Sequence, residues 1–424
     1  MNSGFSGFSG FSGFSGFSGF SGFSGFSGWA RAALVLSTLA CAGLAAGCGS
    51  GSPRASGSRS EPAIPSAPAV TVPLSTSLVT AQGTWAITVM GGSAASENNF
   101  WQLFVRPAGA SRWSLATPPG VADNGGLVAA GTGKSLVIGF RPSQELAFSP
   151  LATSTDTGKD WTPGLLDADL ANDPGAIAVD PSGQALALLQ DGTIQTAPTA
   201  SAAAAGQWSE LTTRPALAAS APGRDCGLQG LDAVSFGVDK TPMAVGSCER
   251  PGVAGVFIDT GGTWRSAGLT LPEQYRGDRA RVLRLAAASG GDVALLLAGH
   301  SLLAAWSNGT HWTVSAPVTG VGSVGAGSVR ASGFGPGGSA WLLLSGGRAE
   351  TVSGPGAAWQ ELPTVPPGTM TLAPAGTATL ASGPGGGYDA LAVSGSKLTV
   401  WRLTKAAWVQ AQLIKVPIEY GSSS

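Results

Sequence analysis

Seven tryptophans at a nearly constant spacing constrain the fold of this 424-residue chain more than any other feature of its sequence. Successive members of the series lie 48, 47, 56, 48, 47 and 49 residues apart. A regular period of roughly 20 to 50 residues is typical of chains built from similar supersecondary units, each too small to bury its faces alone. We therefore expect the units to pack against one another and share a core. The series is Trp113, Trp161, Trp208, Trp264, Trp312, Trp359 and Trp408.

The segments between the tryptophans predict four short strands in each unit. In the sixth unit, short apolar runs separated by glycine-containing turns cover residues 329–333, 340–344, 349–352 and 359–362. The composition agrees with an all-β protein rich in turns, because 65 residues are glycine and only 11% are charged. Four strands per unit predict a β-propeller of seven four-stranded blades over residues 75–417. Six or eight blades are the alternatives, because the first unit is irregular.

The turn before Trp161 has the most complete local pattern, Ser-x-Asp-x-Gly-x-x-Trp over residues 154–161. Its Ser and Asp oxygens can accept hydrogen bonds from amides of the turn, and its Gly can adopt a positive φ. The pattern resembles the Asp-box, or BNR, repeat of sialidase-like β-propellers, which joins the third and fourth strands of a blade. We expect the box residues to serve turn hydrogen bonding and packing, and not catalysis. They are Ser154, Asp156, Gly158 and Trp161, with weaker copies at Asp259, Gly261, Trp264, Gly309 and Trp312.

The N-terminal part of the chain has the features of an export signal. Residues 1–31 are mostly a Ser-Gly-Phe repeat of low complexity, and Arg31 precedes an apolar run at residues 32–47 that is short for a membrane span. A positive charge followed by an apolar stretch and small residues predicts a secretory signal peptide. The end of the run, Leu-Ala-Ala-Gly before Cys48, resembles the lipobox of bacterial lipoproteins.

The lipobox resemblance implies cleavage before Cys48 and attachment of lipid (palmitate among the acyl groups) to that cysteine. The protein would then be anchored to the outer face of the bacterial cell membrane. Residues 48–74, rich in Ser, Gly, Pro and Ala, predict a flexible tether, and residues 418–424 form a tail. The alternatives are a plain cleaved signal with an incidental cysteine, and lipidation at Cys41.

Two cysteines remain in the predicted propeller, Cys226 and Cys248, and both lie in the long 56-residue interval. They flank two predicted neighbouring strands, and an exported protein in an oxidising compartment favours a disulfide between them. A metal site is the minor alternative, because the chain has only two histidines and no Cys-x-x-Cys motif. The sequence predicts no metal and no cofactor.

Charged residues, which are scarce in this chain, gather in loops that a propeller would place on one face. The loops from strand two to strand three and from strand four to the next blade share a face, and loops on a rigid scaffold often carry function. We therefore predict a candidate binding rim, which consists of Glu249, Arg250, Glu273, Tyr275, Arg276, Asp278 and Arg279.

These observations favour a membrane-anchored, extracytoplasmic binding or scaffold module for an unknown protein or an envelope glycan. We expect a monomer, and the net charge of −1 provides no attraction for nucleic acid. The rival hypothesis is a glycan-active enzyme, a glycosidase or lyase that uses Tyr275 with Glu249 or Asp225. We assign no catalytic residue, because the Arg-Ile-Pro motif of sialidases is absent. A third hypothesis is a structural factor in envelope assembly.

Overall fold

The computed structural model describes residues 75–90, 100–119, 126–141, 147–309, 311–319, 328–364, 377–383, 386–405 and 407–416. The chain divides into two units after Ala63, and every described residue belongs to the second unit. The Ser-Gly-Phe tract, the signal peptide, Cys48, the tether and the tail lie outside the described residues. No helix in the described ranges has the length and hydropathy that crossing a lipid bilayer requires.

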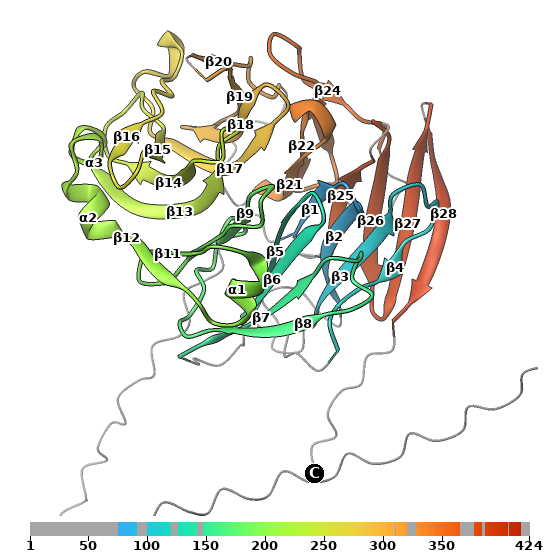
Figure 1. Cartoon of the computed structure of the whole chain (residues 1–424). Coiled ribbons are helices and arrows are strands. Elements are labelled where there is room, and N and C mark those ends of the chain that lie inside the picture. Colours follow the sequence, from blue (N-terminus) through green and yellow to red (C-terminus); the bar gives the residue numbers. More distant parts are fainter. Residues whose placement is uncertain are drawn as a thin grey trace, which may run out of the picture. The chain divides into compact units, whose positions relative to one another are not determined.

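Seven groups of four consecutive strands, each hydrogen-bonded in chain order, make up the described part of the chain (Figure 1). This arrangement confirms the predicted all-β propeller with four-stranded blades. Blades 1 to 3 consist of β1 (Ser75–Thr80), β2 (Gly83–Met90), β3 (Phe100–Pro107), β4 (Ser114–Leu115); β5 (Gly126–Thr132), β6 (Ser135–Arg141), β7 (Ser149–Ser154), β8 (Thr162–Leu166); β9 (Ile177–Val179), β10 (Ala185–Leu188), β11 (Thr193–Ala197) and β12 (Ser209–Thr213). Blades 4 to 7 consist of β13 (Leu228–Phe236), β14 (Pro242–Cys248), β15 (Gly255–Asp259), β16 (Trp264–Ser266); β17 (Ala280–Ala288), β18 (Gly291–Ala298), β19 (Ser301–Ser307), β20 (Trp312–Val314); β21 (Val329–Phe334), β22 (Ala340–Leu344), β23 (Ala349–Val352), β24 (Gln360–Glu361); β25 (Ala378–Ser382), β26 (Tyr388–Ser394), β27 (Lys397–Thr404) and β28 (Ala407–Lys415).

The burial pattern of the strands shows that each blade is covered by its neighbours. The second strands β2 and β22 are buried at every residue, because neighbouring blades cover both faces of the sheet. The outermost strands β4 and β24 are exposed at both of their residues. In the sixth blade, the predicted second and third strands have the observed bounds. The first strand is one residue longer than predicted, and the fourth is one residue shorter at each end.

Two short helices account for the long 56-residue interval of the series: α2 (Arg214–Ala219) and α3 (Ala221–Cys226) lie between β12 and β13. A third short helix, α1 (Ala200–Ala204), lies between β11 and β12 of blade 3. Thr213 and Ser220 cap α2 and α3, since their side chains accept hydrogen bonds from the first-turn amides. No pattern in the sequence predicted these helices.

Four tryptophans of the series, Trp113, Trp312, Trp359 and Trp408, donate an indole hydrogen bond to the blade before their own. The indole Nε1 of Trp312 donates a hydrogen bond to the carbonyl of Ala267 at 2.9 Å, and that of Trp408 donates to the carbonyl of Pro363 at 2.6 Å. Each acceptor lies just beyond the fourth strand of the preceding blade. The constant spacing therefore reflects a contact between blades as well as a turn. Trp161, Trp264 and Trp312 are half-buried.

We expect Trp312→Phe to cost about 1 kcal/mol more unfolding free energy than Trp401→Phe. Both substitutions remove the same ring volume from a half-buried site. Only Trp312 has an indole hydrogen bond to lose, because Trp401 Nε1 has no partner among the described residues. Urea unfolding of the two variants measures the difference. Equal losses would show that the contact between blades is not a source of stability.

The ring closes by an unusual pairing of strands. Strand β1 of the first blade pairs in parallel with β21 of the sixth, with Thr76 opposite Ser332 and Ser77 opposite Gly333. The Thr76 hydroxyl also donates to the Ser332 carbonyl at 3.0 Å. The first strand of blade 7, β25, packs against β1, β2 and β21 and does not separate β1 from β21. Seven blades are present, but the innermost ring consists of the six strands β1, β5, β9, β13, β17 and β21.

Apolar clusters nevertheless fill all seven junctions between successive blades. Blade 7 packs against blade 6 through residues that include Trp341 and Leu380, and against blade 1 through residues that include Phe104 and Leu391. The other junctions are filled in the same way. In the described part of the chain, apolar packing therefore continues around the whole ring of blades.

A buried carboxylate fastens blade 7 to blade 1. Asp389 on β26 accepts hydrogen bonds from Arg106 Nη1 at 2.6 Å, Trp113 Nε1 at 2.8 Å and Arg402 Nε at 2.9 Å. The side chain of Gln412 on β28 makes two further 2.8 Å hydrogen bonds with the backbone of Trp113. We call these five residues the Asp389 clasp. Because blades 1 and 7 contribute no strand to each other's sheets, side chains supply the polar link at this junction.

Candidate functional site

The Ser and Asp side chains of the box turn at residues 154–161 form hydrogen bonds within the turn itself. The Ser154 hydroxyl donates to Asp156 Oδ1 at 2.9 Å and accepts from the Gly158 amide at 2.9 Å. The Asp156 carboxylate accepts from the amides of Asp160 at 3.0 Å and Lys159 at 3.2 Å. The Asp160 amide is the main reason why the pKa of Asp156 is lowered. Gly158 has a φ of +73°, so the turn uses each residue type as the sequence analysis expected.

The weaker copies of the box also join third and fourth strands. Asp259 Oδ1 accepts from the amide of Gly262 at 2.8 Å, and Gly261 beside it has a φ of +66°. Gly309, with a φ of +89°, donates its amide to the Ser307 hydroxyl at 2.9 Å. Trp264 and Trp312 then begin β16 and β20.

The two ends of the propeller are distinguished by their turns. Gln82, in the turn between β1 and β2, donates to the carbonyl of Thr155 at 2.6 Å and accepts from the amide of Thr157 at 2.9 Å. Turns from first to second strands therefore share a face with the box turns, and we call it the box face. On the opposite face, the amide of Gly252 donates to the carbonyl of Asp278 at 2.9 Å. That bond joins the loop between β14 and β15 to the loop between β16 and β17.

The predicted binding rim lies on this second face, over blades 4 and 5. Glu249, Arg250, Glu273, Arg276 and Arg279 are exposed there, and Asp278 is half-buried. The interpretation of Tyr275 as a rim residue is wrong. Tyr275 belongs to the short helix η1 (Glu273–Tyr275), is only 9% exposed and lies in the apolar core between blades 4 and 5. Its burial also weakens the hypothesis of a glycan-active enzyme, which relied on this hydroxyl. From here on, the charged rim means the six residues other than Tyr275.

A disulfide lies at the base of the charged rim. Cys226 and Cys248 are bonded as predicted, with their Cα atoms 5.2 Å apart. The two rim residues that follow Cys248 are held by backbone bonds, because the Glu249 amide donates to Gly227 at 2.9 Å and the Arg250 amide donates to Cys226 at 3.0 Å. The described residues contain no cluster of His, Cys, Asp and Glu that could hold a metal.

A second set of charges lies on the inner strands, where the sequence analysis assigned no site. Arg281 on β17 is 3.4 Å from Asp232 on β13 and 3.8 Å from Asp173, which precedes β9. This ion network connects blades 3, 4 and 5. Burial is the main cause of the raised pKa of Asp232. Three strands far apart in sequence bring these residues together, so local patterns could not reveal the network.

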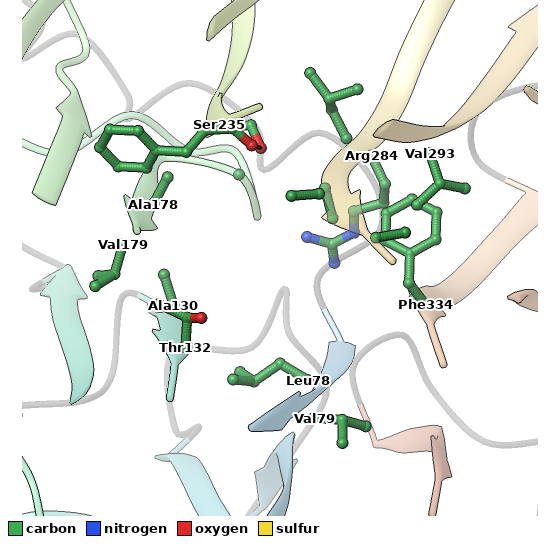
Figure 2. Close-up of a pocket in the computed structure, with 18 of the residues that line it drawn as sticks. Leu78, Val79, Ala130, Thr132, Ala178, Val179, Ser235, Arg284, Val293 and Phe334 are labelled. Atoms are coloured by element: carbon green, nitrogen blue, oxygen red, sulfur yellow. Dashed lines mark hydrogen bonds between the residues drawn. The ribbon is translucent and has the colours of Figure 1, made fainter. Parts of the chain in front are cut away.

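The six-stranded inner ring encloses a central cavity of about 540 Å³. Its lining comes mainly from β1, β5, β9, β13, β17, β21 and the turns that follow them on the box face, and it includes no described residue of blade 7. The guanidinium of Arg284 on β17 projects into the cavity among mostly small apolar side chains (Figure 2). The one sequence signal for this residue is a charge within the apolar run Val282-Leu283-Arg284-Leu285. A bulge in the pairing of β17 with β18 occurs at this position.

No protein-family model matches this chain, and no curated protein sequence matches it significantly. It is similar to the solved structure of YCF48 bound to D1 peptide, at 16% identity over 82% of this chain and 92% of that one, with a TM-score of 0.41. It is also similar to virginiamycin B lyase from Staphylococcus aureus, at 11% identity over 59% and 73% of the two chains, with a TM-score of 0.37. SapL1 lectin in complex with alpha methyl fucoside matches at 12% identity over 82% and 99%, with a TM-score of 0.38.

Likenesses this low say nothing about the ligand or activity of this chain. The class of protein follows from the strand order itself, which defines a seven-bladed β-propeller.

Proposed function

We propose that this protein is an exported binding module that recognises a protein or an envelope glycan through the charged rim. In this proposal, lipidated Cys48 holds the propeller at the outer face of a bacterial cell membrane. The signal pattern in residues 32–47 and the lipobox resemblance support export and anchoring. A disulfide inside the propeller is consistent with an oxidising compartment.

One observation carries the binding proposal: exposed charges of both signs are held on a rigid base. Glu249 and Arg250 follow the disulfide directly, and Arg276 and Arg279 lie in the adjoining loop. The two loops are tied by backbone hydrogen bonds, from the Leu271 amide to the Gly252 carbonyl at 2.9 Å and from the Gly252 amide to the Asp278 carbonyl at 2.9 Å. A surface that is ordered before binding loses less conformational entropy on association. Charges arranged in this way favour a partner of complementary charge pattern.

We expect the double variant Arg276→Glu/Arg279→Glu to lose its partner in cross-linking from intact membranes. The matched control is Arg112→Glu/Lys159→Glu, which makes the same charge change at exposed positions of the box face. Both variants should unfold like the parent protein, because exposed substitutions of this kind usually change stability by no more than about 0.5 kcal/mol. Capture that survives in the rim variant and disappears in the control would move the binding surface to the box face. Glycan turnover by the parent protein would favour the enzyme hypothesis instead.

The anchoring part of the proposal has its own measurement. Mass spectrometry of the mature N-terminus should find an acylated Cys48, and Cys48→Ser should remove the protein from the membrane fraction. An unmodified Cys48 in the mature protein would contradict the proposed lipid anchor.

A further inference from the structure

The fourth strand of blade 7, β28, differs from the other outermost strands of the described propeller. It is nine residues long, whereas the fourth strands of the other six blades have two to five residues. It pairs only with β27, so its outer edge has no strand partner among the described residues (Figure 1). A strand that is paired on one side uses alternate backbone groups there, and the remaining N–H and C=O groups point outwards.

The sequence of β28 lacks the features that usually protect an exposed edge. Proteins protect such edges with very short strands, proline or charged side chains. Residues 407–415 contain no proline and only one charged residue, at the C-terminal end. Val409 and Leu413 are 52% and 47% exposed. They pair with Arg402 and Thr399, which are three residues apart on β27, so each face of the blade offers one apolar contact beside the free edge.

Side-chain contacts hold β28 in position. The side chain of Gln412 accepts a hydrogen bond from the Trp113 amide and donates one to the Trp113 carbonyl, both at 2.8 Å. Trp408 is buried, and its indole donates to the carbonyl of Pro363 at 2.6 Å. The edge is therefore ordered before binding, which lowers the entropy lost when a partner associates.

Exposed lysines lie at both ends of this edge. Lys415 is opposite Lys397 at one end, and Lys405 lies in the turn between β27 and β28 at the other. Asp389 is the one acidic residue in the described part of blade 7. It is buried within the Asp389 clasp, where it already binds two arginines, and it does not offset the lysines. The excess of positive charge favours an acidic partner.

A second copy of the chain fits this charge pattern poorly. Antiparallel pairing of two β28 strands about a two-fold axis would bring the Lys415 end of each strand beside the Lys405 turn of the other. Like charges that face each other across paired strands oppose the pairing. An extended segment with acidic residues at its ends would instead meet opposite charges at both ends of β28.

We propose that the outer edge of β28 binds an extended, acidic segment of a partner protein, which adds to blade 7 as a fifth strand. Backbone hydrogen bonds would provide affinity, and the contacts with Val409, Leu413 and the lysines would provide selectivity. This surface lies on the outer wall of blade 7 and uses none of the charged-rim residues. It therefore does not depend on the proposed function.

Calorimetric titration of the mature protein with three blocked peptides tests the proposal. The probe is acetyl-Glu-Glu-Thr-Val-Thr-Val-Thr-Glu-Glu-amide. In the second peptide, lysine replaces all four glutamates, and in the third, the five central amide nitrogens of the probe are methylated. We expect the probe to bind at least roughly tenfold more tightly than either counterpart, because one loses the charge attraction and the other loses the strand hydrogen bonds.

A pair of double variants locates the site. Val409→Glu/Leu413→Glu should weaken the probe by at least roughly tenfold, because it removes both apolar contacts and repels the acidic peptide. The matched control is Leu165→Glu/Val238→Glu, which makes the same change at positions 45% and 51% exposed in other blades. Both variants should unfold like the parent, and the control should bind the probe like the parent.

Four outcomes would overturn the proposal. They are no binding of the probe at millimolar concentration, equal binding of the probe and either counterpart, unchanged binding by Val409→Glu/Leu413→Glu, and self-association of the mature protein that this variant abolishes. The last outcome, measured by analytical ultracentrifugation, would assign the edge to a second copy. The rim variant Arg276→Glu/Arg279→Glu should bind the probe like the parent, so a failure of the proposed function is distinguishable from a failure here. If the rim variant loses the probe while the β28 variant keeps it, the peptide binds at the charged rim and the proposal is wrong.

Discussion

Replacing Asp389 with alanine should lower the free energy of unfolding by about 3–5 kcal/mol, the cost of removing one partner from a buried ion pair. Asp389 is 1% exposed and is the shared acceptor of Arg106, Arg402 and Trp113. Burial lowers the pKa of Arg106, and Asp389 opposes that shift. Without the carboxylate, two guanidinium groups remain near the junction with no counter-charge. Urea unfolding of the purified propeller measures the loss.

The position of the damage distinguishes a loss of the clasp from general destabilisation. Amide exchange should accelerate mainly in β25 to β28 and in the facing β3, while β9 to β12 of blade 3 stay protected. Asp191→Ala is a suitable control, because Asp191 is exposed and its carboxylate accepts a hydrogen bond from the Thr193 amide in its own turn. A loss below about 1 kcal/mol in Asp389→Ala would mean that apolar packing alone holds blade 7 to blade 1.

Removing the disulfide with the double variant Cys226→Ser/Cys248→Ser should cost about 3 kcal/mol of unfolding free energy. The bond spans a separation of 22 residues, and cross-linking such a loop removes entropy from the unfolded chain. A reducing agent should cause a similar loss in the parent and no change in the variant. Non-reducing peptide mapping should link the two cysteines, and two free thiols in the exported protein would contradict the pairing.

The same substitution is expected to loosen the charged rim. Glu249 and Arg250 are held by bonds to Gly227 and Cys226, the segment that the disulfide fixes to β14. Partner capture should therefore fall further than the loss of global stability alone explains, when it is measured at a temperature where the variant is fully folded. Unchanged capture would show that the backbone bonds suffice to order the rim.

Local sequence patterns were sufficient to predict the strands and turns within each blade. Strands such as β22 and β23 could be predicted because their apolar runs end at glycine-containing turns. The box turn could be interpreted because Ser154, Asp156 and Gly158 interact within five residues of one another. The pairing of Cys226 with Cys248 could be predicted because both flank one pair of neighbouring strands.

Exposure within the loops was harder to predict from composition. The segment from Glu273 to Arg279 is rich in charge, and this made Tyr275 resemble its exposed neighbours. In the structure, the one-turn helix η1 directs this single ring into the core between blades 4 and 5. Packing between blades decides which residue of a charged loop is buried, and no periodic pattern in such a short segment reports it.

The amino-acid sequence by itself determined the blades, their four strands and the turns between them, because these depend on contacts within about 50 residues. Only the tertiary structure decided how the ring closes. The pairing of Thr76 with Ser332 and the contact of Arg106 with Asp389 join residues 256 and 283 positions apart. Those contacts arise from the geometry of the assembled ring, which places blade 7 outside the innermost strands. The same geometry leaves Arg284 pointing into a central cavity, a position that its apolar sequence neighbours could not reveal.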